Sequence, residues 1–332
     1  MPEFRRDPVS GRWAIIAPER GKRPTDFLLP EENTEEGRCP LCPGSEDLTP
    51  PEVLALGRPE EAPPNSPGWK VRVVPNKYPA LIPGEIEEEE TGGLYERFSG
   101  AGVHEVIVET PEHGKPLVRF SPNELALVFE AYRLRLVELA RDGRWRYVLI
   151  FKNRGARAGA SLSHDHSQLV ALPLIPELVK IELERSRIYH ERNGECLFCK
   201  LVKSEQNGPR WICENERFLA FMAYAPRQPL ETWIMPKKHR SDFLDHFDEN
   251  LEALCDIFLR VFGKLEAVLP GLPYNFVLHT APLGSAPLPY YHWHFEIIPC
   301  LTRVAGFEWG TGAYIVPLLP EEAAAFLRDI SP

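Results

Sequence analysis

Residues 164–168 read His-Asp-His-Ser-Gln, and this stretch decides how the rest of the chain is interpreted. Side chains alternate between two faces along a strand, so His164, His166 and Gln168 would share one face. The pattern returns in altered form at residues 292–296, which read His-Trp-His-Phe-Glu. The stretch predicts a strand that carries chemistry, and its return indicates an internal repeat.

The repeat extends well beyond the histidines. Each half has a Cys-x-x-Cys pair, a strand leading to a Pro-x-His or Pro-x-x-His segment, an amphipathic helical stretch, and a strand before its His-x-His. The matching segments are 39–42 and 196–199, 105–113 and 231–239, 123–139 and 250–269, and the strands beginning at Tyr147 and Tyr274. Four markers in one order predict an α+β protein with two tandem domains, residues 1–192 and 193–332.

Bulk composition is consistent with two packed domains and excludes some classes of binding partner. The chain has 332 residues, is 43% hydrophobic and carries a formal charge of −10. This acidic balance argues against nucleic acid or a membrane surface as a partner. The start of the chain lacks the apolar core of a signal peptide, and no apolar run is long enough to span a membrane. We therefore expect a cytoplasmic protein.

The paired cysteines indicate zinc. Four of the seven cysteines lie in the two Cys-x-x-Cys pairs, and in a reducing compartment such pairs favour metal over disulfides. Zinc binds thiolates and imidazoles tetrahedrally, so each half would supply two cysteines and two histidines. The predicted ligand sets are Cys39, Cys42, His113 and His164 for the first zinc, and Cys196, Cys199, His239 and His292 for the second. Buried thiols or a redox motif are the alternatives. His104 is a rival of His113, but its place inside an expected strand at residues 103–108 favours a packed or hydrogen-bonded residue.

A metal-bound His164 would leave His166 free as a nucleophile toward phosphorus. The charge on the phosphoryl oxygens must then be held by hydrogen-bond donors. The candidates around the glycine-rich link are Gln168, Asn153, Ser161 and Ser163, and the best upstream basic cluster contains Arg20, Lys22 and Arg23. In the second repeat Glu296 replaces the glutamine and no glycine-rich loop precedes it. His294 is therefore not expected to be a second nucleophile.

Taken together, these segments resemble the galactose-1-phosphate uridylyltransferase branch of the histidine-triad superfamily. The resemblance covers nearly the whole chain and is carried by residues 20–24, 39–44, 74–79, 111–113, 151–155 and 164–168. It implies a tandem pair of histidine-triad-like domains, each an antiparallel sheet with packed helices. It also implies a cytoplasmic homodimer of galactose metabolism that uses two zinc ions.

The same resemblance implies a ping-pong nucleotidyl transfer. His166 would take UMP from a UDP-hexose such as UDP-glucose, release hexose 1-phosphate, and pass the UMP to a second hexose 1-phosphate. Asn76 would contact the nucleoside. Phosphates would be held by Asn153, Ser161 and Gln168, and the site would be lined by Arg20 and Arg23.

Two departures from the family pattern point to a related activity. The family commonly has His-Pro-His-Gly-Gln at residues 164–168, and a Lys and a Glu where this chain has Gly306 and Gly312. Phe307 and Gly310 in the same segment remain candidate substrate contacts. These differences resemble the ADP-glucose phosphorylase type, which moves AMP from ADP-glucose to phosphate. A family variant also places the second metal elsewhere, on residues equivalent to Glu182, His279, His292 and His294.

Overall fold

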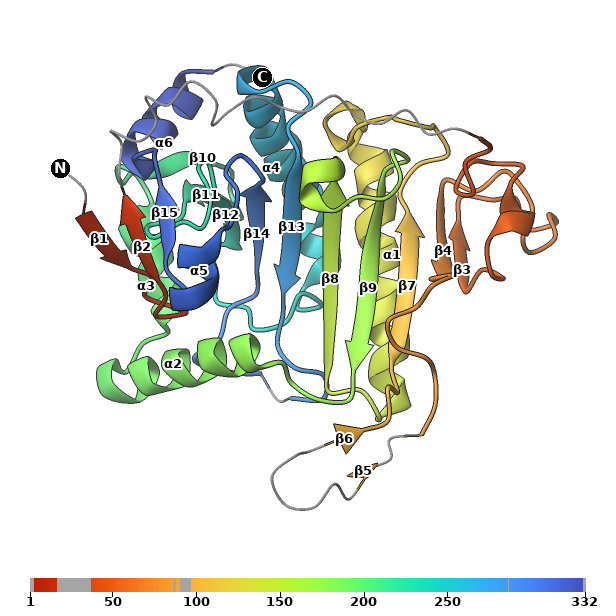
Figure 1. Ribbon diagram of the computed structural model, residues 1–332, viewed down its shortest axis with the longest axis horizontal. Helices are drawn as coiled ribbons and strands as arrows, with labels where there is room; N and C mark the ends of the chain where they lie inside the picture. Colours follow the sequence, from red (N-terminus) through yellow and green to blue (C-terminus); the bar gives the residue numbers. More distant parts are fainter. Residues whose placement is uncertain (1–2, 17–36, 86–87, 90–96, 286, 331–332) are drawn as a thin grey trace.

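The computed structural model describes residues 3–16, 37–85, 88–89, 97–285 and 287–330. Most of the strands belong to one sheet, and the helices are arranged around it (Figure 1). The strands are β1 Glu3–Arg6, β2 Trp13–Ile16, β3 Leu54–Leu56, β4 Val71–Pro75, β5 Glu88–Glu89, β6 Arg97–Phe98, β7 Val103–Val108, β8 Tyr147–Arg154, β9 His166–Leu172, β10 Trp211–Glu214, β11 Phe218–Met222, β12 Thr232–Pro236, β13 Tyr274–His279, β14 His294–Pro299 and β15 Tyr314–Val316. The helices are α1 Pro122–Asp142, α2 Glu177–Asn193, α3 Leu197–Glu205, α4 Phe247–Val268, α5 Gly306–Thr311 and α6 Pro320–Asp329.

A ten-stranded sheet has the order β10-β11-β12-β14-β13-β8-β9-β7-β4-β3, and all its neighbouring pairs are antiparallel. The strands of the first predicted repeat lie together on one side, and those of the second lie together on the other. Pairing of β8 with β13 joins the two groups, with Asn153 opposite Asn275. The predicted α+β class with antiparallel sheets and packed helices is confirmed.

The two helices predicted inside the repeats are α1 and α4, which pack against each other and lie behind the sheet in Figure 1. α1 begins with a capping box in which Ser121 and Glu124 satisfy each other's backbone donors, and it ends at Gly143 in the left-handed conformation. Its buried residues Leu125, Phe129 and Tyr132 recur at helical spacing and join the main core cluster. This core covers one face of the sheet with apolar side chains.

The two faces of β9 carry different kinds of residue. Ser167, Leu169 and Ala171 are fully buried, and the Ser167 hydroxyl is hydrogen-bonded to the Tyr132 hydroxyl of α1 at 2.8 Å. These odd-numbered residues therefore face the helices. Because side chains alternate along a strand, His166 and Gln168 lie on the opposite face. The helix layer is thus not on the side where the predicted chemistry lies.

The two ends of the described chain meet in a smaller sheet. β2 pairs antiparallel with β1 and parallel with β15, so residues near 14 and near 315 are neighbours. Among the helices described, none has the length and apolarity required to cross a bilayer.

Candidate active site

His166 is the first residue of β9, and its geometry suits a nucleophile. The residue is 7% exposed, and its Nδ1–H group donates to the carbonyl oxygen of His164 at 2.7 Å. This bond places the ring proton on Nδ1, so Nε2 keeps its lone pair. Burial, assisted by the nearby Lys152 ammonium, lowers the pKa of His166 below its ordinary value. The ring is therefore neutral near pH 7.

The first predicted zinc set is gathered at the end of the strand, next to this histidine. The ligand atoms of Cys39, Cys42, His113 and His164 all lie within 4.8 Å of one another. The Cys42 Sγ is 3.4 Å from the His113 Nδ1 and 3.5 Å from the His164 Nδ1. Tetrahedral zinc would hold such a sulfur and nitrogen about 3.6 Å apart. His164 also donates from Nε2 to the Thr110 carbonyl at 2.7 Å, which leaves Nδ1 as the metal-facing atom.

The second predicted set is gathered in the same way. The ligand atoms of Cys196, Cys199, His239 and His292 also lie within 4.8 Å of one another. The Cys199 Sγ is 3.4 Å from the His239 Nδ1, and His239 donates from Nε2 to the Leu288 carbonyl at 3.0 Å. Two sets of this composition at equivalent positions of the repeat are both fit to hold a metal ion.

The alternative second metal set is present too, but without His292. Glu182, His279 and His294 form a separate group whose ligand atoms lie within 4.8 Å of one another. The His279 Nδ1 is 3.1 Å from a Glu182 oxygen, and the His294 ring stacks between His279 and Trp233 at centroid distances of 4.7 and 4.9 Å. The Cys-His set and the Glu182 group share no residue, so each could hold its own metal ion. The stacked, fully buried His294 is not placed like a nucleophile.

The two predicted amide donors lie on the same face as His166. Asn153 is on β8 and Gln168 on β9, and both are partly exposed. A Cβ added to Gly159 would lie 3.7 Å from the Asn153 Nδ2, so this amide faces the glycine-containing turn at residues 155–159. His104 lies between Asn76 and Gln168. Its Nε2 is 3.2 Å from the Asn76 Nδ2 and 2.8 Å from the Gln168 Oε1.

The remaining predicted substrate contacts are dispersed. Ser161 is exposed on the loop before β9, whereas the Ser163 hydroxyl lies 3.0 Å from the His113 Nε2, at the first metal set. Phe307 and Gly310 are exposed on α5. Arg20 and Arg23 lie outside the described residues.

Two residues that contact the predicted amide donors were given no role in substrate binding by the sequence analysis. Asn275 of β13 donates to Asn153, and His104 of β7 contacts Gln168, as a packed or hydrogen-bonded residue would. The only sequence signal for Asn275 was its place in the strand that repeats β8.

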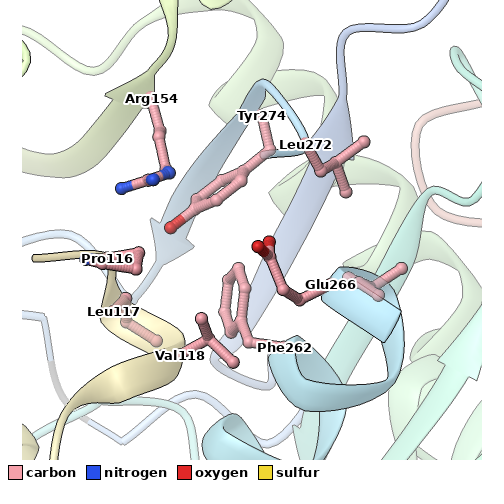
Figure 2. Close-up of a pocket in the computed structure, with 9 residues that line it drawn as sticks. Pro116, Leu117, Val118, Arg154, Phe262, Glu266, Leu272 and Tyr274 are labelled. Atoms are coloured by element: carbon pink, nitrogen blue, oxygen red, sulfur yellow. The ribbon is translucent and has the colours of Figure 1, made fainter. Parts of the chain in front are cut away.

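A pocket on the helix side of the sheet is too small for a substrate. It lies between residues 116–118, the end of α4 and the start of β13, and the polar ends of Arg154, Glu266 and Tyr274 turn into it (Figure 2). Its cavity volume of about 10 Å³ holds roughly one water molecule. The candidate active site is instead the opposite face, on which His166, Asn153 and Gln168 lie together.

Known proteins are similar to this chain in sequence. The model of the galactose-1-phosphate uridyl transferase N-terminal domain matches residues 1–176, and a domain of unknown function (DUF4921) matches residues 127–329. An ADP-glucose phosphorylase of Arabidopsis thaliana is 38% identical over 99% of this chain and 93% of its own length. A galactose-1-phosphate uridylyltransferase of Thermotoga maritima is 30% identical over 99% of this chain and 98% of its own.

Solved structures agree with these matches. A crystal structure of the Arabidopsis ADP-glucose phosphorylase with bound ADP-glucose has a TM-score of 0.85 and 36% identity, with 100% of both chains covered. A uridylyltransferase structure has a TM-score of 0.75 and 30% identity, covering 99% of this chain and 97% of its own. Fold and site thus define a nucleotidyltransferase of the histidine-triad type. The chain belongs to the galactose-1-phosphate uridyl transferase family.

Proposed function

We propose that this protein transfers a nucleoside monophosphate from a nucleotide sugar to a phosphate-bearing acceptor, through a covalent intermediate on His166. The observation that carries the proposal is the Nδ1–H bond from His166 to the His164 carbonyl. It leaves a neutral Nε2, shielded from water by burial, on the sheet face that also carries Asn153 and Gln168.

The reaction takes place in two displacements at one phosphorus atom. In the first, the lone pair of His166 Nε2 forms a bond to the α-phosphorus, and the bond from that phosphorus to the bridging oxygen breaks. The sugar leaves as its 1-phosphate, a stable anion that needs no strong general acid. In the second, an oxygen of the acceptor phosphate attacks the same phosphorus, and the electron pair of the nitrogen–phosphorus bond returns to His166.

Protein groups must stabilise the positive charge on the modified His166 ring and the negative charge on the phosphoryl oxygens. While the phosphorus is attached, the ring of His166 is cationic, and the His164 carbonyl at 2.7 Å stabilises its Nδ1–H group. Amide nitrogens of Asn153 and Gln168 would donate to the phosphoryl oxygens, with Ser161 and the backbone of the glycine-containing turn beside them. Asn76 would contact the nucleoside, and Arg20, Arg23, Ser163, Phe307 and Gly310 complete the proposed substrate contacts.

We assign zinc to the two Cys-His sets in a structural role. A four-ligand thiolate–imidazole site is closed, so bound zinc would fix the fold and leave no open position for substrate. The first set includes His164, whose backbone carbonyl orients His166. The metal would therefore hold the segment that carries the nucleophile.

Uridylyl transfer between hexose 1-phosphates is the first candidate activity. It is supported by the family model over residues 1–176 and by the Thermotoga maritima relative. UDP-glucose would be the donor and galactose 1-phosphate the acceptor, which would place the enzyme in galactose metabolism.

Adenylyl transfer from ADP-glucose to phosphate is the second candidate, and a specific observation favours it. Gly312 ends α5 at φ 68°, a left-handed conformation in which the family's glutamate would be strained. Gly306 likewise has no side chain to replace the family's lysine. The 38% identical Arabidopsis relative carries the name of this activity.

The experiment that tests the proposal is intact-protein mass spectrometry after mixing with UDP-glucose or ADP-glucose, without acceptor. A uridylyl adduct that disappears in His166→Ala supports the first candidate, and an adenylyl adduct with the same dependence supports the second. The variant should keep its fold and zinc content. Absence of an adduct with both donors, and of turnover with galactose 1-phosphate or phosphate, would refute covalent transfer.

We further propose a cytoplasmic homodimer. Four of the seven cysteines lie in the two Cys-His sets, which suits a reducing compartment. Sedimentation of the purified protein would give the mass of a dimer, and a monomer across the micromolar range would contradict the proposal.

A further inference from the structure

We propose that Asn275 and His104 are positioning residues that turn the amides of Asn153 and Gln168 nitrogen-first toward the substrate phosphates. The inference rests on the proposed nucleotidyl transfer, because it gives these two amides a phosphate to bind. Neither positioning residue touches the reacting atoms. Each acts by occupying the oxygen of an amide whose two ends have nearly the same shape.

The hydrogen bonds around Asn275 allow only one orientation. Its side chain lies 2.8 Å from the Ala158 carbonyl oxygen, and a carbonyl can only accept, so the atom facing it must be the amide nitrogen. The same nitrogen lies 2.8 Å from Asn153. The Asn153 atom at that position must then be an acceptor, its Oδ1. The Asn153 nitrogen is consequently directed away from Asn275.

A third partner closes this arrangement. The Cys300 thiol lies 3.1 Å from the Asn275 Oδ1 and donates to it. Burial raises the pKa of Cys300, so the thiol keeps its proton at neutral pH. Asn275 therefore has both ends of its amide occupied. Because it belongs to β13, the second half of the chain orients a phosphate donor that belongs to the first half.

A parallel argument fixes Gln168. The backbone N–H of Ala80 donates to the His104 Nδ1 at 3.0 Å, so a neutral His104 must carry its proton on Nε2. This proton is donated to the Gln168 Oε1 at 2.8 Å. The Asn76 nitrogen, 3.2 Å from the same Nε2, is then a close contact of two donors and no hydrogen bond. The Gln168 nitrogen is left to face the substrate.

Orientation matters because the wrong end of an amide repels phosphate. Removal of one catalytic hydrogen-bond donor commonly lowers the rate about a hundredfold or more. An amide that can rotate freely would present its oxygen part of the time. The two positioning residues remove that alternative before the substrate arrives.

The test reverses the polarity of one partner while keeping its shape. Asn275→Asp would offer Asn153 an acceptor, so the Asn153 amide should rotate and turn its oxygen toward the phosphates. Asn275→Ala would only release it. We expect kcat/KM for adduct formation to fall about tenfold to a hundredfold in Asn275→Asp and less in Asn275→Ala. Because Asp also places a carboxylate beside the Ala158 carbonyl oxygen and near the phosphates, this order alone does not identify the cause, and the double-mutant cycle decides it.

A double-mutant cycle separates orientation from general damage. In an Asn153→Ala background there is no amide to rotate, so Asn275→Asp should have little further effect. An equal loss in both backgrounds would overturn the proposal. Asn193→Asp at the exposed end of α2 makes the same chemical change on the surface and should match the wild type. Circular dichroism melting verifies that each variant is folded.

Two further measurements complete the design. His104→Gln keeps a donor for Gln168 and should retain more activity than His104→Leu, and equal loss would reject the role of His104. If the wild type forms no adduct, the proposed transfer has failed. Calorimetric binding of UDP and ADP then decides the orientation separately. A loss of affinity in Asn275→Asp that disappears in the Asn153→Ala background supports it, and a loss that persists there, or no binding, rejects it.

Discussion

Replacement of Lys152 on β8 by methionine should measure how much a buried ion pair contributes to the stability of the protein. Lys152 is fully buried, and its ammonium group contacts the carboxylate of Glu109, which is also buried. The Glu109 carboxylate accepts a second hydrogen bond from Tyr132 at 3.1 Å, and Asp165 lies 3.4 Å from the ammonium group. Methionine keeps most of the volume of lysine but leaves the charge of Glu109 without its counter-ion.

The size of the effect follows from this geometry. Breaking a buried pair by removal of one partner destabilises a protein by about 3–5 kcal/mol, because the other charge remains desolvated. Unfolding entropy near 60 °C is about 2.1 cal/mol/K per residue, or roughly 0.7 kcal/mol/K for a chain of this length. Lys152→Met should therefore lower Tm by about 4–7 °C.

Differential scanning calorimetry and urea unfolding measure this change. The matched control is the double variant Lys152→Met with Glu109→Gln, which removes the unpaired charge and keeps an acceptor for Tyr132. It should recover most of the lost stability. A change in Tm smaller than about 2 °C in the single variant, or a double variant less stable than the single one, would refute the reasoning.

Three further predictions concern the metal, the backbone and the charged surface. His164→Ala should lower both bound zinc and Tm, as read by elemental analysis and calorimetry, and unchanged zinc would show that this residue is no ligand. Gly155→Ala should cost about 1–3 kcal/mol in urea unfolding, because φ is 79° and the added Cβ would lie 3.0 Å from the Cβ of Pro273; a neutral effect would contradict this strain. Burial alone would raise the pKa of Glu321, but hydrogen bonds from residues including Arg5 lower it. Its stabilisation is therefore present above the unfolded pKa of about 4.3 and is lost as pH falls through the folded value, so Glu321→Gln should flatten the acid side of the Tm–pH curve.

Sequence patterns predicted the parts of this molecule that repeat. The Cys-x-x-Cys pairs and their histidines were found because duplicated spacing is visible in one chain, and α1 and α4 because their apolar residues follow the helical period. The pairing of β8 with β13 was not predictable, since either strand could equally well have formed an edge. The role of Asn275 depends on that pairing and was missed with it.

Orientation of side-chain amides was also beyond the sequence. Asn153 and Gln168 were predicted as donors from their positions. Whether an amide presents nitrogen or oxygen depends on neighbours brought from residues 80, 104, 158 and 300, which only the fold brings together.

The small sheet that joins the chain's two ends has a consequence for synthesis. β2 at residues 13–16 pairs with β15 at residues 314–316, so β2 leaves the ribosome long before the strand that pairs with it. During translation the early strand therefore lacks this partner, and its backbone donors and acceptors on that side remain unpaired. Pairing over so long a sequence separation closes slowly compared with local structure. We expect this pairing to be among the last contacts to form when the chain folds.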